Sequence, residues 1–563
     1  MILNSLNNIS KYQAKNLNVI IILFSWILLW AAIGSKPANI TEFLYHVNIW
    51  EDLRTSMVYE LIKTSTFSII FNFLRSISPL FIIFIVLFLI CRSKTEAKPI
   101  NHINAIILFF FIYTIFQFIG FFLSYLTDTL PSGTHSAQDI FVSWTNFIEE
   151  NTGPQTELLK ELNINTKMEF WNDWHYIEAG IKELYWILLV ISSLSIFYMI
   201  EKESNQFLYK NLFYLTVVII LLISLVSIFP VIIEFISTKK SLYYNKSLGQ
   251  RGVFDLAETP NASGLSRMFL ISYIVSIVSF FFLETSKSKK YFIFVISCLF
   301  SFLVIVLQSR ASIVGFIIVN FILFLFLNIK LSKKVFIFII IFIVPFFLKS
   351  QFTNFVQSKI LKVTTEEIIE YKKKDLASLS STDKLYHSDR IKIFKKGFEG
   401  TIEAKRKYKE LFKAGERIPE DVIEKLNTDI STGRFYDWVT LFEYSKSKPF
   451  FGYGPLADRF LIGSTASNAF VYALICSGYF GVICILLLCF SAFFDSLVLI
   501  FKYKVFRNLK NVHLISSILI LSFLLFRGLV ESSFAVYGTD FLLFLISAVV
   551  IKNEKKTLQK LSL

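Results

Sequence analysis

The chain has 563 residues, of which 54% are hydrophobic and 17% aromatic, and it carries a formal net charge of +15. A soluble globule of this length cannot bury so large a share of apolar side chains, so the composition excludes a soluble enzyme and indicates a polytopic membrane protein. The positive charge could indicate nucleic acid as a partner. Most of the excess lysine, however, lies in short segments between apolar runs, where membrane topology explains it better. Nucleic acid is therefore not an expected partner.

Twelve apolar runs are long enough to cross about 30 Å of hydrocarbon. They lie near 17–34, 67–91, 104–126, 184–200, 212–238, 267–284, 291–308, 311–328, 335–348, 470–501, 512–527 and 532–551. The first run has no small-residue cleavage site behind it, so we interpret it as a retained helix. Basic residues fall in every second connection, which predicts that these connections and both termini are cytoplasmic. The expected fold is all-α, with about twelve transmembrane helices.

The longer polar connections all fall on the opposite, outer face of the membrane. The large outer loop 349–469 contains charged, amphipathic stretches, which predict that it is helical. It has no counterpart in the first half of the chain, so we find no internal repeat. We divide the chain into 1–348, with nine transmembrane helices and outer loops 35–66, 127–183 and 239–266; 349–469, the large outer loop; and 470–563, with three transmembrane helices and a cytoplasmic tail.

The stretch 431–481 leads from the large loop into the tenth apolar run. Its first part predicts an amphipathic helix lying on a surface, because apolar residues recur with helical spacing at Phe435, Trp438, Val439 and Phe442. Prolines and glycines then predict a turn at Pro449, Gly452, Gly454 and Pro455. Ser467 and Asn468 open the apolar run that follows, which has a glycine near its middle.

These residues resemble the signature of the O-antigen ligase/polymerase superfamily. The matching positions are Gly433-Arg434 with Trp438, the segment from Pro449 to Pro455, Ser467-Asn468 and the Gly478 to Gly481 helix segment. The resemblance covers roughly 239–551 and includes 249–267 and Ser309-Arg310. It implies a glycosyltransferase of the bacterial inner membrane that takes a polyprenyl-pyrophosphate-linked glycan as donor, without a cofactor. Lipid-linked glycans and membrane lipids are the implied partners, and a chain-length regulator would be a further one.

Arginines on the outer face are the main catalytic candidates, because the orientation rule places basic residues on the other side. Arg310 lies in a tight connection between two apolar runs, Arg251 on a glycine-flanked loop, and Arg434 at the start of the amphipathic helix. A planar guanidinium suits pyrophosphate oxygens, so we expect these three to bind the pyrophosphate and neutralise the charge that develops as it leaves. Snorkelling to lipid phosphates is the alternative interpretation, above all for Arg310.

Further residues are expected to contact the substrate. Arg527 and Glu531 are spaced four apart, which lets them pair on one helix face and marks either a cavity or a packing contact. Arg75 should reach the outer head-group level, where it contacts substrate or snorkels. Asn468 is a candidate through the resemblance. Candidate proton acceptors on the outer face are His387, Asp255, Glu258, Asp437 and Glu531.

Ser467 bears on the choice between two reactions. The ligase branch of the family has a histidine at this position, and serine does not titrate near neutral pH, so the sequence favours a polymerase over a ligase. A lipid-linked oligosaccharide flippase is an alternative that the helix number suits, although flippases have two similar halves.

A metal-dependent glycosyltransferase is a further alternative, with Glu51 and Asp52 as its paired acids. Helix capping explains these two acids equally well. All five cysteines lie in or beside apolar runs, and no outer segment has metal-ligand spacing. We therefore expect a metal-independent enzyme.

Overall fold

The computed structural model describes residues 19–28, 31, 81–85, 105–126, 184, 186–198, 206–237, 262–307, 309–355, 434–462, 465–508 and 511–561. Regular structure in these ranges is helical throughout, which confirms the all-α class. Five of the described helices are long and apolar enough to cross a membrane: α6 (Ala105–Leu126), α11 (Ala262–Phe282), α12 (Lys287–Val306), α14 (Leu331–Phe355) and α21 (Ala469–Phe501).

Shorter or more polar helices complete the described part of the bundle. They are Val19–Leu28, Trp186–Tyr198, α10 (Gln206–Ser237), α13 (Arg310–Phe326), α23 (Val512–Gly528) and α24 (Thr539–Leu561), with the short α22 (Val505–Asn508) and the 3-10 turn η6 (Ser533–Ala535). Each of the twelve expected runs contains a described helical segment, although the last run is α-helical only from Thr539 onward. The number of membrane crossings stays a prediction.

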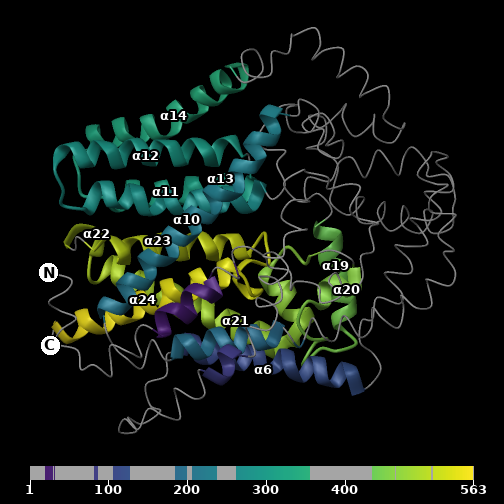
Figure 1. Cartoon of the computed structure of the whole chain (residues 1–563). Coiled ribbons are helices and arrows are strands. Elements are labelled where there is room, and N and C mark those ends of the chain that lie inside the picture. The colour runs from purple at the N-terminus through teal and green to yellow at the C-terminus, as the bar shows by residue number, and fades with distance from the viewer. Residues whose placement is uncertain are drawn as a thin grey trace, which may run out of the picture.

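The long helices lie side by side with their axes in roughly one direction (Figure 1). Contacts link α14 to α12, α12 to α11, α11 to α23, α23 to α24, and α21 to α6. α10 crosses this array obliquely, whereas α19 (Arg434–Ser445) and α20 (Ala457–Ile462) lie at one end of it (Figure 1). The arrangement brings residues from both halves of the chain to that end.

Burial follows the position of each helix in the array. α23 and α24 are apolar on all sides and almost fully buried, from Leu514 to Leu524 and from Phe541 to Ile551. Among the described helices, α14 makes its main contacts with α12 and α13, and it exposes large apolar residues such as Phe336 and Phe346. An exposed apolar helix of this kind is what a lipid-facing position requires.

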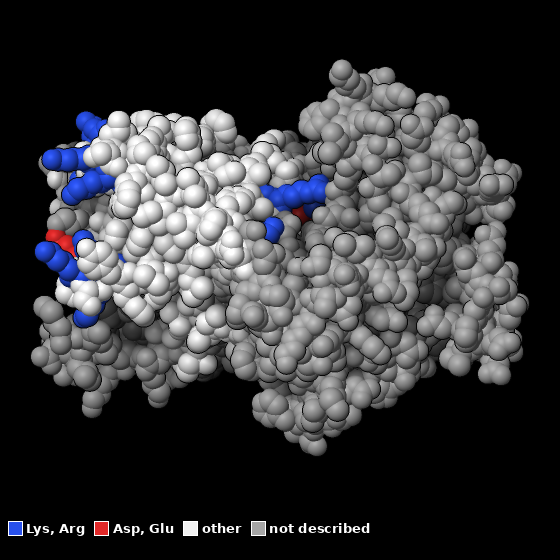
Figure 2. Space-filling view, turned by 90° about the horizontal axis from the view of Figure 1, so that it is seen from above, with Lys and Arg blue, Asp and Glu red and all other residues white. Residues whose placement is uncertain are grey.

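The two ends of the array differ in charge. One end, which we call the lysine-rich end, carries the α11–α12, α13–α14 and α21–α23 connections, with exposed Lys287, Lys289, Lys330, Lys333, Lys502 and Lys504. The other, the arginine end, carries Arg267, Arg310, Arg434 and Arg527. Figure 2 shows basic side chains gathered at one end of the described surface, with a smaller charged group farther along it. The alternation of basic connections read from the sequence therefore corresponds to two distinct ends.

Several expectations fall outside the described residues. Most of the large loop lies there, since α14 continues to Phe355 and the description resumes at Arg434. The loops 35–66, 127–183 and 239–266 lie there almost entirely, and with them Glu51-Asp52, Asp255 and Glu258.

Candidate functional site

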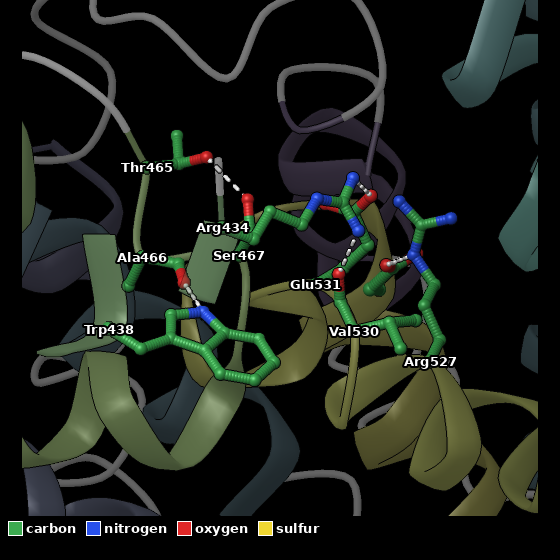
Figure 3. A network of polar contacts seen from close by, with 9 residues as sticks. Arg434, Trp438, Thr465, Ala466, Ser467, Arg527, Val530 and Glu531 are labelled. Carbon is green, nitrogen blue, oxygen red and sulfur yellow. Dashed lines mark hydrogen bonds and ion pairs between the residues drawn. The ribbon is translucent and has the colours of Figure 1, made fainter. Parts of the chain in front are cut away.

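Helix α19 places Arg434 at the arginine end. Its most buried residues are Leu441 and Ser445, Trp438 is partly buried, and Phe442 is 48% exposed. The segment in front of α21 contacts this helix, since the Trp438 Nε1 donates to the Ala466 carbonyl at 2.6 Å (Figure 3). The position of α19 on a membrane surface stays a prediction. This contact fixes the rotation of α19 and so the direction of its first residue.

Arg434 binds the turn that follows α23. Its Nη1 donates to the Val530 carbonyl at 2.7 Å, and its Nη2 donates to Glu531 Oε1 at 2.9 Å (Figure 3). The Arg434 side chain is 36% exposed and that of Glu531 22%. The guanidinium is thus held in one place by two bonds while part of it remains accessible.

Arg527 does not form the expected pair with Glu531. α23 ends at Gly528, so Glu531 lies beyond the helix and not on its face. The Arg527 Nε instead lies 3.0 Å from Asp540 Oδ2, at the start of α24. The other carboxylate oxygen, Oδ1, lies 3.0 Å from Nη1 of Arg267 in α11. One buried carboxylate therefore joins three helices, and the pairing inferred from the spacing of four is wrong.

These five residues form two ion-paired groups, Arg434 with Glu531 and Arg267–Asp540–Arg527, at the same end of the bundle. We call the two groups together the charge network. The network holds three arginines and two carboxylates and therefore has one net positive charge. The Asp540 and Arg527 side chains are only 3% and 7% exposed, and the Ser533 Oγ donates to Asp540 at 3.1 Å. A buried excess of positive charge is costly unless an anion compensates it.

Asn468 is the N-cap residue of α21, and both the oxygen and the nitrogen of its side-chain amide form hydrogen bonds. Its side-chain oxygen accepts from the backbone N–H groups of Phe470 and Val471, as an N-cap residue does, and its Nδ2 donates to the Leu529 carbonyl at 2.9 Å. Asn468 thereby connects α21 to the same turn that Arg434 binds. The geometry supports a positioning role for this residue.

Residues 446–456 form the expected turn. This turn forms hydrogen bonds with backbone groups of α21 at a point where that helix is interrupted. Gly478, inside α21, has φ +64° and ψ −164°, which interrupts the helix. Tyr479 N–H donates to the Pro449 carbonyl, while the Ile475 carbonyl accepts from Tyr453 N–H at 2.9 Å. In an unbroken helix these two groups of α21 would bond to each other. The turn therefore supplies the partners that the break removes.

Close backbone contacts hold this turn against two helices. A Cβ at Gly478 would lie 2.2 Å from the Phe450 carbonyl carbon, and one at Gly120 in α6 would lie 2.2 Å from the Phe451 carbonyl oxygen. Only glycine allows such an approach. The Lys448 Nζ also donates to Ser124 of α6 at 2.7 Å. The turn is thus held between α6 and α21.

Only part of the predicted site is assembled in the described residues. Arg434, Asn468, Arg527 and Glu531 converge around the turn after α23. Arg310 is the first residue of α13, at the same end and exposed, with Ser309 at the helix N-cap position. Arg75, Arg251 and His387 lie outside the described residues.

Neither Arg267 nor Asp540 was predicted from the sequence. Asp540 lies within the last apolar run, and an acid in such a run is a signal for a buried partner or a functional site. Arg267 stands at the start of the sixth run, where it could also have been noticed. Among the described residues, no group of three or more His, Cys, Asp or Glu side chains is placed to hold a metal ion.

Comparisons with known proteins add no relative: no family model, curated protein or solved structure matches the chain.

Proposed function

We propose that the chain is a membrane glycosyltransferase that joins polyprenyl-pyrophosphate-linked oligosaccharides, as an O-antigen polymerase does. The observation that carries the proposal is the convergence of Arg434, Arg527 and Arg267 at the end of the bundle opposite the lysines. Arginines with one net positive charge suit a pyrophosphate group at head-group level. The sequence resemblance, which includes Arg434, the 449–455 turn and Asn468, supports the same reaction.

In the proposed reaction, a hydroxyl of the acceptor sugar attacks the anomeric carbon of the donor sugar. The new C–O bond forms as the bond to the pyrophosphate oxygen breaks, the hydroxyl proton is lost to a base, and the lipid pyrophosphate leaves with its added negative charge. Arg434 and Arg310 would neutralise that charge, with Arg434 held in place by Glu531 and Val530. Ser467, with φ +48° and a hydrogen bond to Thr465, would lie beside the acceptor.

Deletion of the gene tests the function directly. We expect lipid-linked single repeat units to accumulate, because they are made but not joined, and long polymer to disappear. Gel banding of surface polysaccharide and mass analysis of extracted lipid-linked glycan measure both. The purified enzyme should keep its activity in EDTA, since its arginines would replace a metal as the source of positive charge.

Three other results would replace this proposal. Polymer that accumulates on its polyprenyl carrier without reaching the final acceptor would indicate a ligase. Repeat units confined to the inner leaflet would indicate a flippase. Loss of activity in EDTA with rescue by a divalent cation would return attention to Glu51 and Asp52.

The proposal also fixes the orientation of the bundle. Single cysteines introduced at Lys446, at the arginine end, and at Lys504, at the lysine-rich end, replace exposed side chains. We expect a membrane-impermeant maleimide to label Lys446→Cys in intact spheroplasts and to label Lys504→Cys only after permeabilisation. The reverse pattern would place the arginine end in the cytoplasm and rule out the proposed outer-face reaction.

A further inference from the structure

The helices α11, α13 and α23 meet in an apolar layer just below the arginine end. A Cβ added at Gly315 of α13 would lie 2.3 Å from the Phe523 ring and 3.1 Å from Leu270. The α13 backbone at Gly315 therefore lies against side chains of both other helices and leaves no room there for a larger residue. We call this apolar layer of Leu270, Gly315 and Phe523 the floor.

One helical turn closer to the arginine end than this apolar layer, the side chains are polar. α11 and α13 run away from that end and α23 runs toward it, so the residues one turn above Leu270, Gly315 and Phe523 are Arg267, Ser312 and Arg527. Residues three or four apart share a helix face, so these three side chains come from the faces that meet at the floor. The ion pairs of Arg267 and Arg527 with the single carboxylate of Asp540 confirm that α11 and α23 meet at this level.

This second layer has unused hydrogen-bonding groups. The Arg527 side chain is 7% exposed, and its Nη1 has no hydrogen-bond partner; the Nε of Arg267 and the Oγ of the fully buried Ser312 have none either. Buried donors without partners cost free energy, and two arginines against one carboxylate leave a positive charge as well. One anionic group with several acceptor oxygens would supply both the missing hydrogen-bond acceptors and the missing negative charge.

We infer that Arg267, Arg527 and Ser312 form a binding site for one phosphoryl group. Three acceptor oxygens suit the free guanidinium N–H groups and the serine hydroxyl, and the floor of Gly315, Phe523 and Leu270 excludes water beneath the group. Arg267, which is 18% exposed, is the most accessible member of this site. This inference rests on the proposed function only in naming the lipid-linked pyrophosphate as the natural source of the group; a phospholipid head group or free phosphate has the same chemistry.

Ligand-dependent thermal unfolding of the full-length protein in detergent tests the site. The three probes are inorganic pyrophosphate, a short-chain polyprenyl pyrophosphate and phosphatidylglycerol. We expect both pyrophosphates to raise the unfolding temperature and phosphatidylglycerol to have little effect, because ligand that binds only the folded state stabilises it. A rise with phosphatidylglycerol alone would reassign the site to bulk lipid, and no rise with any probe would overturn the inference.

Ser312→Ala is the decisive variant, since it removes one hydroxyl that bonds nothing in the described structure and leaves the ion pairs intact. We expect pyrophosphate binding about tenfold weaker than in the wild type, because one bond to a charged group is lost. Ser522→Ala is the matched control, as the Ser522 Oγ bonds the Ile518 carbonyl within α23. Equal affinity of Ser312→Ala and wild type would contradict the site.

A second variant separates a binding site from a structural ion pair. Asp540→Asn raises the net charge of the Arg267–Asp540–Arg527 group, so the stability of this variant should depend more strongly on pyrophosphate than that of the wild type. A purely structural pair predicts a loss of stability that pyrophosphate does not restore. Binding can be measured without turnover, so the two ideas can fail separately. If the Ser312→Ala protein makes polymer and binds pyrophosphate with unchanged affinity, only the phosphoryl site is wrong. If the wild-type protein binds pyrophosphate but the deletion strain still makes normal polymer, only the proposed function is wrong.

Discussion

Replacing Arg310 with lysine is expected to lower polymer synthesis by roughly ten- to a hundred-fold. Arg310 begins α13 at the arginine end with its side chain exposed, where a guanidinium can bind two pyrophosphate oxygens at once. Lysine keeps the charge but loses the paired geometry, and one charge-assisted hydrogen bond is worth about 1.5–3 kcal/mol. Polymer banding in cells, normalised to the amount of protein in the membrane, measures the effect.

The control for this change is Arg507→Lys, which makes the same substitution at an exposed position of the lysine-rich end. It should leave polymer synthesis unchanged. If Arg310 only snorkels to lipid phosphates, lysine serves as well and Arg310→Lys will also resemble the wild type. That result would remove Arg310 from the site.

Replacing Gly478 with alanine is expected to destabilise the protein by about 3–5 kcal/mol. Alanine at φ +64° is strained, and its Cβ would meet the Phe450 carbonyl at 2.2–2.3 Å. The 446–456 turn cannot retreat from it, because the backbone at Gly120 of α6 presses on the other side. Denaturant unfolding in detergent and the amount of protein in the membrane should both reveal the loss.

Gly538→Ala is the matched control, since a Cβ at Gly538 meets no atom within 4 Å. We expect its cost to stay within about 1 kcal/mol, the size of an unfavourable helix-cap change. Comparable stability of the two variants would mean that the turn does not dock into the break of α21 as described.

Features coded by neighbouring residues could be predicted from the sequence. Apolar runs predicted the helices, Pro449 and Gly452 to Gly454 predicted the turn, and Asn468 marked the start of α21. Each of these depends on local backbone preference or on a single helix in lipid, so no distant contact had to be known.

Features decided by packing between distant segments could not be predicted in this way. Arg527 pairs with Asp540 because α23 ends at Gly528 and the chain turns before α24, and spacing alone does not reveal where a helix ends. The packing of α19 involves the carbonyl of Ala466, which lies 28 residues after Trp438. The role of Gly478 also depends on partners in a separate segment.

The break at Gly478 also has a consequence for how α21 fits the bilayer. An unbroken helix from Ala469 to Phe501 would be about 50 Å long, far more than about 30 Å of hydrocarbon. The part from Tyr479 onward is about 35 Å long and matches that thickness with a modest tilt. The first part, Ala469 to Ser477, then lies at the level of the lipid head groups, together with the turn that bonds to it. In that position Ala469 to Ser477 is buried among neighbouring segments, so the outer end of α21 is surrounded by protein while only the part from Tyr479 onward has to match the hydrocarbon.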